Sequence, residues 1–466
     1  MDTAIMLFTR DLRVHDHPAL AAACEAARHV VPVFVFDDVL LAGAPNRARF
    51  LLDSLADLRA SLRARGGDLL LRRGDPVVEA LRLAEEAGAQ GIFLSDDVSR
   101  YATRRRTRLE REGARRRIRV SVHPGLTVVP PGDLTPAGGD HYRVFTPYWR
   151  VWSAARWRPM ADAPDRVALP SRLYLSPNHV ELDVIAEKFA RDPSPGLQPG
   201  GESAGRERMR TWLRDGLTGY EDGHDDLPGN RTSRLSPYLR FGCLSPLEPA
   251  VAARERTGGE AFVRQLAWRD FHHQVTAAFP DIDRVDYRPR GTEWNQDRDA
   301  LDAWREGRTG FPIVDAGMRQ LLREGWMHNR ARMICASFLT RDLRVDWRHG
   351  LAHFGAWLAD GDVANDAGNW QWVAGTGNDT RPNRVLNPLR QAARFDPDGR
   401  YVREHVPELA EVAAPYVHTP WRLPDDLRLR LGYPAPIVEP RSDGGPPDLS
   451  GRAPAGVLSG GRRGAA

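Results

Sequence analysis

Hydrophobic and polar positions follow two different patterns along this chain. Between residues 4 and 123, five short apolar runs alternate with segments whose apolar residues recur at helical spacing. The runs are AIMLF, VVPVFVF, DLLLRRG, GIFLS and RVSVH, and several are continuously apolar, as buried parallel strands are. The segments between them are PALAAACEAAR, residues 48–65, PVVEALRLAEEAG and TRRRTRLEREG. This alternation predicts a doubly wound parallel sheet flanked by helices.

The pattern changes after residue 130. Residues 131–200 are rich in proline and glycine and are predicted to form an interdomain linker, partly ordered by the aromatic cluster YRVFTPYWRVW. Helical periodicity dominates residues 201–437, which hold ten of the thirteen tryptophans, whereas residues 1–130 hold none. The Gly- and Pro-rich segment 438–466 is predicted to be a disordered tail. The predicted fold class is therefore α/β plus all-α.

Composition narrows the class of protein. A chain of 466 residues is too long for one ordinary core, so at least two domains are expected. Three widely spaced cysteines without a CxxC motif argue against a disulfide framework and fit a reducing cytoplasm. No apolar run is long enough to span a bilayer, so a cytoplasmic protein is expected. The basic residues are nearly all arginine, which suits phosphate groups.

Several common enzyme classes have no support in the sequence. The chain contains no HExxH, no GxSxG and no Walker lysine, and GTGNDT at 375–380 lacks the third glycine and the preceding strand of a dinucleotide fingerprint. Asp360, Asp362 and Asp366 match no calcium loop, and no histidine accompanies them in the sequence. No metal site is therefore predicted.

The segment NRTSRLSPYLRFG places hydroxyl groups around the start of a predicted helix. Thr232, Ser233 and Ser236 lie where free backbone N–H groups attract anions, and Arg234 lies among them. One hydroxyl would serve as an ordinary helix N-cap. Three hydroxyls with an arginine exceed that need, so a diphosphate ligand is a second interpretation.

Three predicted helices carry mixed polar and aromatic stripes at spacings of three and four residues. The stripes are Phe262, Gln265, Trp268 and Arg269; Asn329 and Met333, with Trp326 and Arg330 adjoining them; and Asp362, Asp366 and Trp370. Apolar stripes are normally core, but amides, carboxylates and guanidinium groups are costly to bury without a polar partner. The stripes therefore indicate a pocket for a flat, polar, aromatic ligand.

Taken together, these blocks resemble the photolyase/cryptochrome family over nearly the whole chain. LFTRDLRVHDHPAL resembles the opening strand and turn of that family. TSRLSPYLRFG, WRDF, TGFPIVDAGMRQL, GWMHNRARM, DWR, DGD, NWQW and NPLRQAARFDPDG then follow in the order of the family. The resemblance implies an antenna domain, a helical domain that binds U-shaped FAD, and UV-damaged DNA as the partner of a monomer.

The resemblance also assigns residues to the cofactor and to electron transfer. Those that would hold the FAD phosphates are Tyr220, Thr232, Ser233, Arg234, Leu235 and Ser236. Arg332 would pair with Asp360 against the flavin, and Asp362 would contact the same cofactor. Trp370, Trp347 and Trp294 would form an electron-transfer chain from flavin to surface. Core packing is the other interpretation for Trp347 and Trp294 taken singly.

A second set of residues matches the lesion pocket of the family. It comprises Gln265, Trp268, Asn329, Arg330, Met333 and Trp372. The implied reaction is light-driven repair of cyclobutane pyrimidine dimers in DNA. The chain most resembles the class I enzymes that repair this lesion. Excited reduced FAD would transfer an electron to a lesion flipped out of the duplex.

Two positions depart from the pattern of dimer-repairing members. Gln265 stands where dimer-repairing members usually carry Glu. The (6-4) photoproduct photolyases carry Gln at this position, but they carry a histidine at the position of Asn329. Asp366 stands where photolyases usually carry Asn and plant-type cryptochromes carry Asp. A (6-4) photolyase and a cryptochrome-like blue-light photoreceptor are therefore the alternatives. Asp366 is expected to serve as a proton donor, since desolvation beside an anionic flavin favours its protonated form.

A second, light-harvesting chromophore is expected in the N-terminal domain. Folate-binding members have an Asn-Glu pair in the segment that corresponds to SDDVSRYATRRRTR, and this chain has none. The resemblance therefore favours 8-hydroxy-5-deazaflavin over methenyltetrahydrofolate.

Overall fold

The computed structural model describes residues 1–171, 179–378 and 384–441. The predicted tail lies almost wholly outside these residues. The N-terminal region contains a parallel sheet in the order β3-β2-β1-β4-β5. Its strands are β1 (Thr3–Phe8), β2 (His29–Phe36), β3 (Leu70–Arg73), β4 (Gly91–Ser95) and β5 (Arg119–His123). All five predicted strands and the fold class are thus confirmed.

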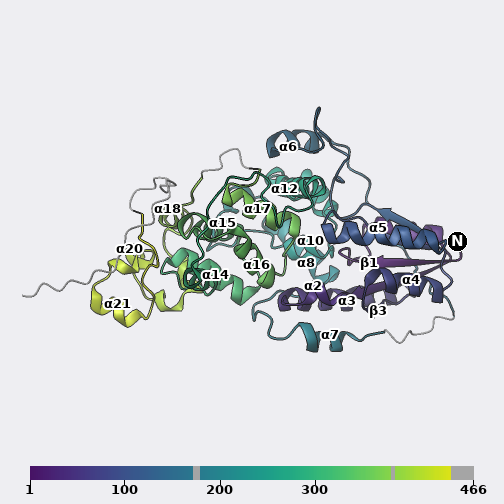
Figure 1. Cartoon of the computed structure of the whole chain (residues 1–466), viewed down its shortest axis with the longest axis horizontal. Helices are drawn as coiled ribbons and strands as arrows, with labels where there is room; N and C mark the ends of the chain where they lie inside the picture. Colours follow the sequence, from purple (N-terminus) through teal and green to yellow (C-terminus); the bar gives the residue numbers. More distant parts are fainter. Residues whose placement is uncertain (172–178, 379–383, 442–466) are drawn as a thin grey trace, which may run out of the picture.

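Alternate residues of β1 enter two different apolar cores, because successive side chains of a strand point to opposite faces. Met6 and Phe8 pack with α1 (Pro18–Ala26) and α3 (Pro45–Arg63). Ile5 and Leu7 pack with α4 (Pro76–Glu86) and α5 (Arg100–Arg115). The short helix α2 (Asp38–Leu41) follows β2. Helices therefore cover both faces of the sheet, as the β-α alternation predicts (Figure 1).

The predicted linker contains two helices, α6 (Phe145–Ala154) and α7 (Leu182–Phe189), which lie on opposite sides of the molecule (Figure 1). The buried carboxylate of Asp270 joins the linker to the helical region. It accepts hydrogen bonds from the backbone N–H groups of Val128 and Val129 at 2.9 and 3.0 Å, and from Trp152 Nε1 at 3.0 Å. Since these are buried polar contacts, they fix the residues just before the linker, and α6 within it, against α12.

Helices dominate the chain after residue 200. In chain order they are α8 (Glu202–Asp215), α9 (Tyr220–Gly223), α10 (Ser236–Arg240), α11 (Leu247–Arg254), α12 (Gly259–Ala278), α13 (Arg298–Arg305), α14 (Pro312–Glu324), α15 (Asn329–Ser337), η1 (Phe338–Asp342), α16 (Trp347–Trp357), α17 (Val363–Ala374), α18 (Pro388–Phe395), α19 (Arg400–His405), η2 (Pro407–Leu409), α20 (Ala414–Val417), η3 (Pro420–Arg422) and α21 (Asp425–Leu431).

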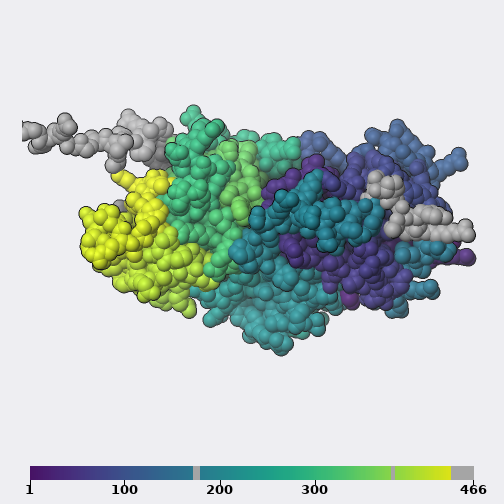
Figure 2. All heavy atoms as spheres, turned by 90° about the horizontal axis from the view of Figure 1, so that it is seen from below, coloured from purple at the N-terminus to yellow at the C-terminus, as the bar shows by residue number. Residues whose placement is uncertain are grey.

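The sheet and the last helices lie at opposite ends of an elongated molecule, with the central helices between them (Figures 1 and 2). One apolar core runs from the sheet face under α1 and α3 into α8, α11 and α12. The predicted domain boundaries therefore stay a prediction, since this core crosses them. Among the described residues, no helix combines the length and apolarity needed to cross a membrane.

Candidate functional site

The acidic residues predicted to face a cofactor lie at the N-terminal end of α17. Asp362 precedes the first helical residue, and Asp366 and Trp370 follow at one-turn intervals, as the spacing predicts. Arg332 on α15 pairs with Asp360, with Nη2 2.7 Å from Oδ2. The structure thus brings Arg332, Asp360, Asp362 and Asp366 together, although their chain positions differ by as many as 34 residues.

The carboxyls of Asp362 and Asp366 have opposite proton affinities. Burial acts to raise the pKa of Asp362, but the guanidinium of Arg10, with those of Arg269 and Arg240, holds this pKa well below its usual range. Desolvation and the neighbouring Asp360 carboxylate raise the pKa of Asp366 to about 7. The backbone N–H of Asp362 donates to Asp366 Oδ2 at 2.8 Å. One carboxyl is thus a fixed anion, and the other can hold a proton near neutral pH.

The predicted phosphate segment precedes α10, and Ser236 is the first residue of that helix. The Ser233 hydroxyl accepts a hydrogen bond from Leu235 N at 3.3 Å, and the Ser236 hydroxyl accepts one from Trp326 Nε1 at 3.3 Å. Within the described part of the chain, the Thr232 hydroxyl is buried without a hydrogen-bond partner. Thr232 also lines a cavity of about 800 Å³ that Arg208 and Arg231 share.

That cavity fits a diphosphate-bearing cofactor. A buried hydroxyl without a protein partner costs free energy unless a ligand or water bonds it. The two arginines offer charged donors to phosphate oxygens. Tyr220, also assigned to FAD, is buried against Trp212, whose ring contributes to the same cavity. The residues present therefore fit the predicted FAD phosphates, whose placement remains a prediction.

Arg234 lies in this segment, but its guanidinium is engaged elsewhere. Nη1 lies 2.8 Å from Glu324 Oε2, and the guanidinium carbon lies 4.1 Å from the ring centre of Trp326. The prediction that Trp326 adjoins the helical stripe of Asn329 and Met333 was wrong. Helix α15 begins only at Asn329, so Trp326 precedes the helix. Trp326 instead supports the phosphate segment through Ser236 and Arg234.

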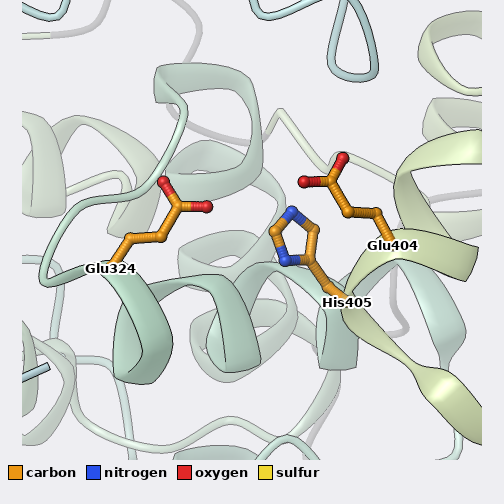
Figure 3. A group of neighbouring side chains, drawn as sticks. All are labelled: Glu324, Glu404 and His405. Carbon is orange, nitrogen blue, oxygen red and sulfur yellow. The ribbon is translucent and has the colours of Figure 1, made fainter. Parts of the chain in front are cut away.

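A group of potential metal ligands lies next to this arginine. Glu324, Glu404 and His405 place their ligand atoms within 4.8 Å of one another, with the imidazole between the two carboxylates (Figure 3). Burial, and then the charges of Arg323 and Arg234, lower the pKa of His405 to about 3. Both carboxylates also contact arginines. Positive charges at this distance oppose a metal cation, so the group is interpreted as an ion-pair network that holds Arg234.

The predicted lesion-pocket residues come from three adjoining helices, because α17 packs against both α12 and α15. Gln265 on α12 and Asn329 on α15 are exposed. Asn329 and Met333 share a face, with Nδ2 3.8 Å from Sδ. Arg330 forms a two-point ion pair with Asp225, at 3.1 and 2.6 Å.

The two tryptophans of this set have aromatic or cationic neighbours. Trp268 stacks on Phe145 with ring centres 3.6 Å apart and planes 8° apart. Trp372 is half-buried, and the guanidinium of Arg384 lies 4.9 Å from its ring centre. Phe145 belongs to α6, so the predicted linker supplies a wall behind Trp268 that the sequence pattern did not reveal.

The three tryptophans predicted to transfer electrons belong to one apolar core or pack against it. Trp370 and Trp347 are buried, and Trp294 is half-buried. The ring of Trp370 packs directly on the backbone of Gly350, one helical turn after Trp347. The contact is so close that a Cβ atom added at residue 350 would lie 2.1 Å from Cη2 of the Trp370 indole. Trp294 lies next to Asn295, whose N–H donates to Arg344 O at 2.6 Å in the segment just before α16.

A second cavity lies at the carboxyl ends of β1, β2 and β4, where ligands of doubly wound sheets usually bind. It has a volume of about 470 Å³ and is lined by Phe34, Asp37, Asp97, Tyr101 and Arg105, among others. Tyr101 Oη donates to Asp37 Oδ2 at 2.5 Å. This cavity includes part of the segment assigned to the antenna chromophore.

Several residues of the site carried no signal in the sequence. Arg10 lines the strand-end cavity, pairs with Asp97 at 3.3 Å and pairs with Asp362 at 2.9 Å. His273 Nε2 lies 3.8 Å from Asp362 Oδ2, so a histidine does adjoin the acidic residues. Burial, and then Arg269, lower the pKa of His273 to about 4, so it is neutral at pH 7. These residues are far from Asp362 in the chain, and only folding reveals the contacts.

The comparisons with known proteins agree with this geometry. The family described as "DNA photolyase" matches residues 4–166, and "FAD binding domain of DNA photolyase" matches residues 262–443. The chain is 53% identical to the deoxyribodipyrimidine photo-lyase of Streptomyces griseus, covering 94% of this chain and 97% of that protein. The chain belongs to the DNA photolyase family. It is therefore an enzyme of the photolyase type with an FAD-binding domain.

Solved structures of the family superpose closely on this photolyase. A cryptochrome of Synechocystis sp. PCC6803 gives a TM-score of 0.88 at 29% identity, covering 94% of this chain and 97% of that chain. An archaeal photolyase from Sulfolobus tokodaii, described with two FAD molecules, gives a TM-score of 0.82 at 29% identity, covering 94% and 96%. Overall structural similarity therefore does not distinguish a DNA-repair enzyme from a light receptor. That distinction must come from individual residues.

Proposed function

We propose that this protein repairs cyclobutane pyrimidine dimers in DNA, using blue light and bound FAD. The observation that carries the proposal is the arrangement around α17, where the Arg332–Asp360 pair and Asp366 adjoin Trp370 at the start of a tryptophan series. The Streptomyces relative is named for action on deoxyribodipyrimidine. Reduced FAD, when bound and excited, supplies the electron that opens the cyclobutane ring and takes it back afterwards.

The residues of the chain would bind and orient the two partners. Thr232 would donate its free hydroxyl to a phosphate of FAD, and Arg332, held by Asp360, would face the flavin ring. Trp268, backed by Phe145, and Trp372 would stack against the flipped dimer. Gln265 and Asn329 would bond its base edges, since each amide both donates and accepts.

One feature favours dimer repair over (6-4) repair, and the residue that favours a receptor is compatible with dimer repair. Asn329 is exposed on α15 at the position where (6-4) enzymes are expected to carry a histidine, so the proton-transfer group for that lesion is replaced by an amide. Asp366 is the residue that favours a receptor. The raised pKa of Asp366 would let this residue give a proton to the flavin after photoreduction. Repair by enzyme that is already reduced does not use that step.

The direct test illuminates reduced protein with an oligonucleotide that contains one thymine dimer, and follows the recovery of thymine absorbance. Recovery under blue light and none in the dark is the expected result. Absence of recovery with FAD bound would favour the photoreceptor.

The specificity test substitutes Gln265. Gln265→Glu should preserve or raise dimer repair and create no (6-4) repair, because a carboxylate accepts the pyrimidine N3–H more strongly than an amide does. Gln296→Glu, at an exposed residue that lines neither of the two cavities, is the matched control and should change neither activity. Appearance of (6-4) repair in Gln265→Glu would overturn the assignment of the lesion.

We also propose that the strand-end cavity holds the antenna chromophore, with 8-hydroxy-5-deazaflavin favoured over methenyltetrahydrofolate. The cavity lies where doubly wound sheets bind ligands, and Tyr101, Arg105 and Phe34 offer stacking and cationic contacts to a flat anionic ring. Protein purified from a host without deazaflavin should carry FAD alone and should gain a second absorption band on adding deazaflavin. Tyr101→Ala should lose that band and retain FAD.

A further inference from the structure

The middle tryptophan of the series has a charged environment that its buried position does not suggest. Trp347 is fully buried, yet its indole Nε1 donates a hydrogen bond to Asp286 Oδ1 at 3.0 Å. The guanidinium carbon of Arg348 lies 4.5 Å from the centre of the same ring. Trp347 is therefore held between a carboxylate at its edge and a cation over its face.

The carboxylate is fixed in place from α17. Asp286 lies in the segment between α12 and α13, which Gln371 holds by three hydrogen bonds. Its Nε2 donates to Ile282 O at 2.6 Å and to Val285 O at 3.0 Å, and its Oε1 accepts from Tyr287 N at 2.8 Å. Gln371 is fully buried between Trp370 and Trp372 in the chain. The glutamine of the NWQW motif thus positions the carboxylate that contacts the next tryptophan of the series.

The two charges have opposite effects on the oxidation of Trp347. A cation over the ring opposes loss of an electron, and a carboxylate bonded to the indole N–H favours it. Arg348 pairs with Asp286 at 2.7 Å and with Asp346 at 3.0 Å. Asp346 otherwise caps α16, accepting from Arg348 N at 3.0 Å, whereas the indole N–H donates to Asp286. Only one of the two carboxylates is therefore placed to act on the ring directly.

We propose that Asp286 is a positioning residue for electron transfer, which makes Trp347 easier to oxidise than Trp370. The inference rests on the proposed function and deepens it. Bound FAD would supply the light-driven oxidant that leaves Trp370 one electron short, and one electron from Trp347 would then restore Trp370. The proton stays on Nε1, hydrogen-bonded to Asp286, and no covalent bond changes. One electron from Trp294 then restores Trp347, so the positive charge moves towards the surface.

The test uses a Trp294→Phe background, in which the positive charge stops at Trp347. Flash spectroscopy of the FAD-loaded protein follows the absorbance of the oxidised indole. Asp286→Asn keeps an acceptor oxygen but removes the charge and leaves Arg348 over the ring. It should lower the yield of long-lived oxidised indole by about a hundredfold, the scale expected for one charge about 5 Å away at an effective dielectric constant of about 20. Asp346→Asn, the matched control, keeps the hydrogen bond between Asp286 and the indole, and should lower the yield several-fold less than Asp286→Asn does.

Arg348→Gln provides the converse measurement. It should raise the yield, and Asp286→Asn with Arg348→Gln should return it to within about threefold of the background, because both charges are then gone. Equal yields in Asp286→Asn and Asp346→Asn, or a lower yield in Arg348→Gln, would overturn the inference. Trp347→Phe separates this from failure of the proposed series. If it leaves the yield of oxidised indole unchanged, Trp347 is not in the series, whatever Asp286 does.

Discussion

At the scale of single residues, the site depends on side chains whose properties the neighbours change. Asp362 caps α17 and Asp366 lies one turn later, yet arginines keep the first ionised and desolvation keeps the second near its point of titration. Trp268 has one face covered by Phe145, which keeps its ring fixed. Predictions at this scale concern proton supply and stacking.

Asp366→Asn should slow proton uptake by the photoreduced flavin, because an amide cannot donate the proton. Since the pKa of Asp366 is raised to about 7, the parent should be fast below pH 7 and slow down as pH rises through 7, where the donor proton is lost. The variant should be slow and independent of pH across this range. The readout is the long-wavelength flavin absorbance after a flash.

Asp342→Asn is the control for this prediction. Burial also raises the pKa of Asp342, to about 6, but this residue lies on η1 and pairs with Arg441. It should leave the pH profile unchanged. Equal rates in Asp366→Asn and the parent would show that the proton comes from another group.

Trp268→Ala should weaken binding of dimer-containing DNA by about 1–3 kcal/mol, the scale of one base-stacking contact, and should leave FAD bound. Trp268→Phe retains a ring against Phe145 and should recover most of the affinity. Fluorescence anisotropy with a labelled oligonucleotide measures both. A Trp268→Ala protein that purifies without FAD would show that this ring supports the cofactor instead.

At the scale of elements, α17 organises the site. Its N-terminal end presents Asp366, its buried face holds Trp370 and Gln371, and Trp372 follows at the next position. The three hydrogen bonds of Gln371 attach this helix to the segment 282–287. The helix therefore sets the positions of groups on both sides of the tryptophan series.

Gln371→Ala should lower the free energy of unfolding by about 1–3 kcal/mol, because it leaves buried backbone groups of Ile282 and Tyr287 without partners. Asn369→Ala, on the same helix but exposed, is the control and should cost less than about 0.5 kcal/mol. Denaturant unfolding measures both changes. Equal costs would mean that water replaces the three bonds.

At the scale of the whole molecule, one side chain connects the two candidate cofactor regions. Arg10, just after β1, lines the strand-end cavity, and its guanidinium joins Asp97 of the sheet domain to Asp362 of the helical domain. An intact buried ion pair has little net effect on the free energy of unfolding. Removing one partner strongly destabilises the protein, because the other charge is then buried and unpaired.

Arg10→Gln should therefore destabilise the protein by about 3 kcal/mol at pH 7 and weaken FAD binding. The pKa of Asp362 is lowered, so its contribution to stability is present above its ordinary value of 3.8 and is lost as pH falls. The difference between variant and parent should then shrink below about pH 4. Arg63→Gln, which breaks an exposed pair with Asp68, should cost less than about 1 kcal/mol at either pH. Thermal unfolding across pH tests both variants.

The sequence by itself determined the strands, the main helices between them and the stripes on α12 and α17, because these depend on local periodicity. It also carried the family blocks, since a motif is a local pattern. It misplaced Trp326, because the start of α15 depends on a cap at His328 that spacing does not reveal.

Only the tertiary structure brought Arg10 to Asp362, Phe145 to Trp268, and Asp286 to Trp347. Each contact joins residues 61 to 352 positions apart. Such contacts form only when distant elements pack together, and the charges and rings they bring then set the pKa of Asp362 and the surroundings of Trp347. Periodicity determines on which face of its helix or strand a residue lies, but packing determines which residues contact that face.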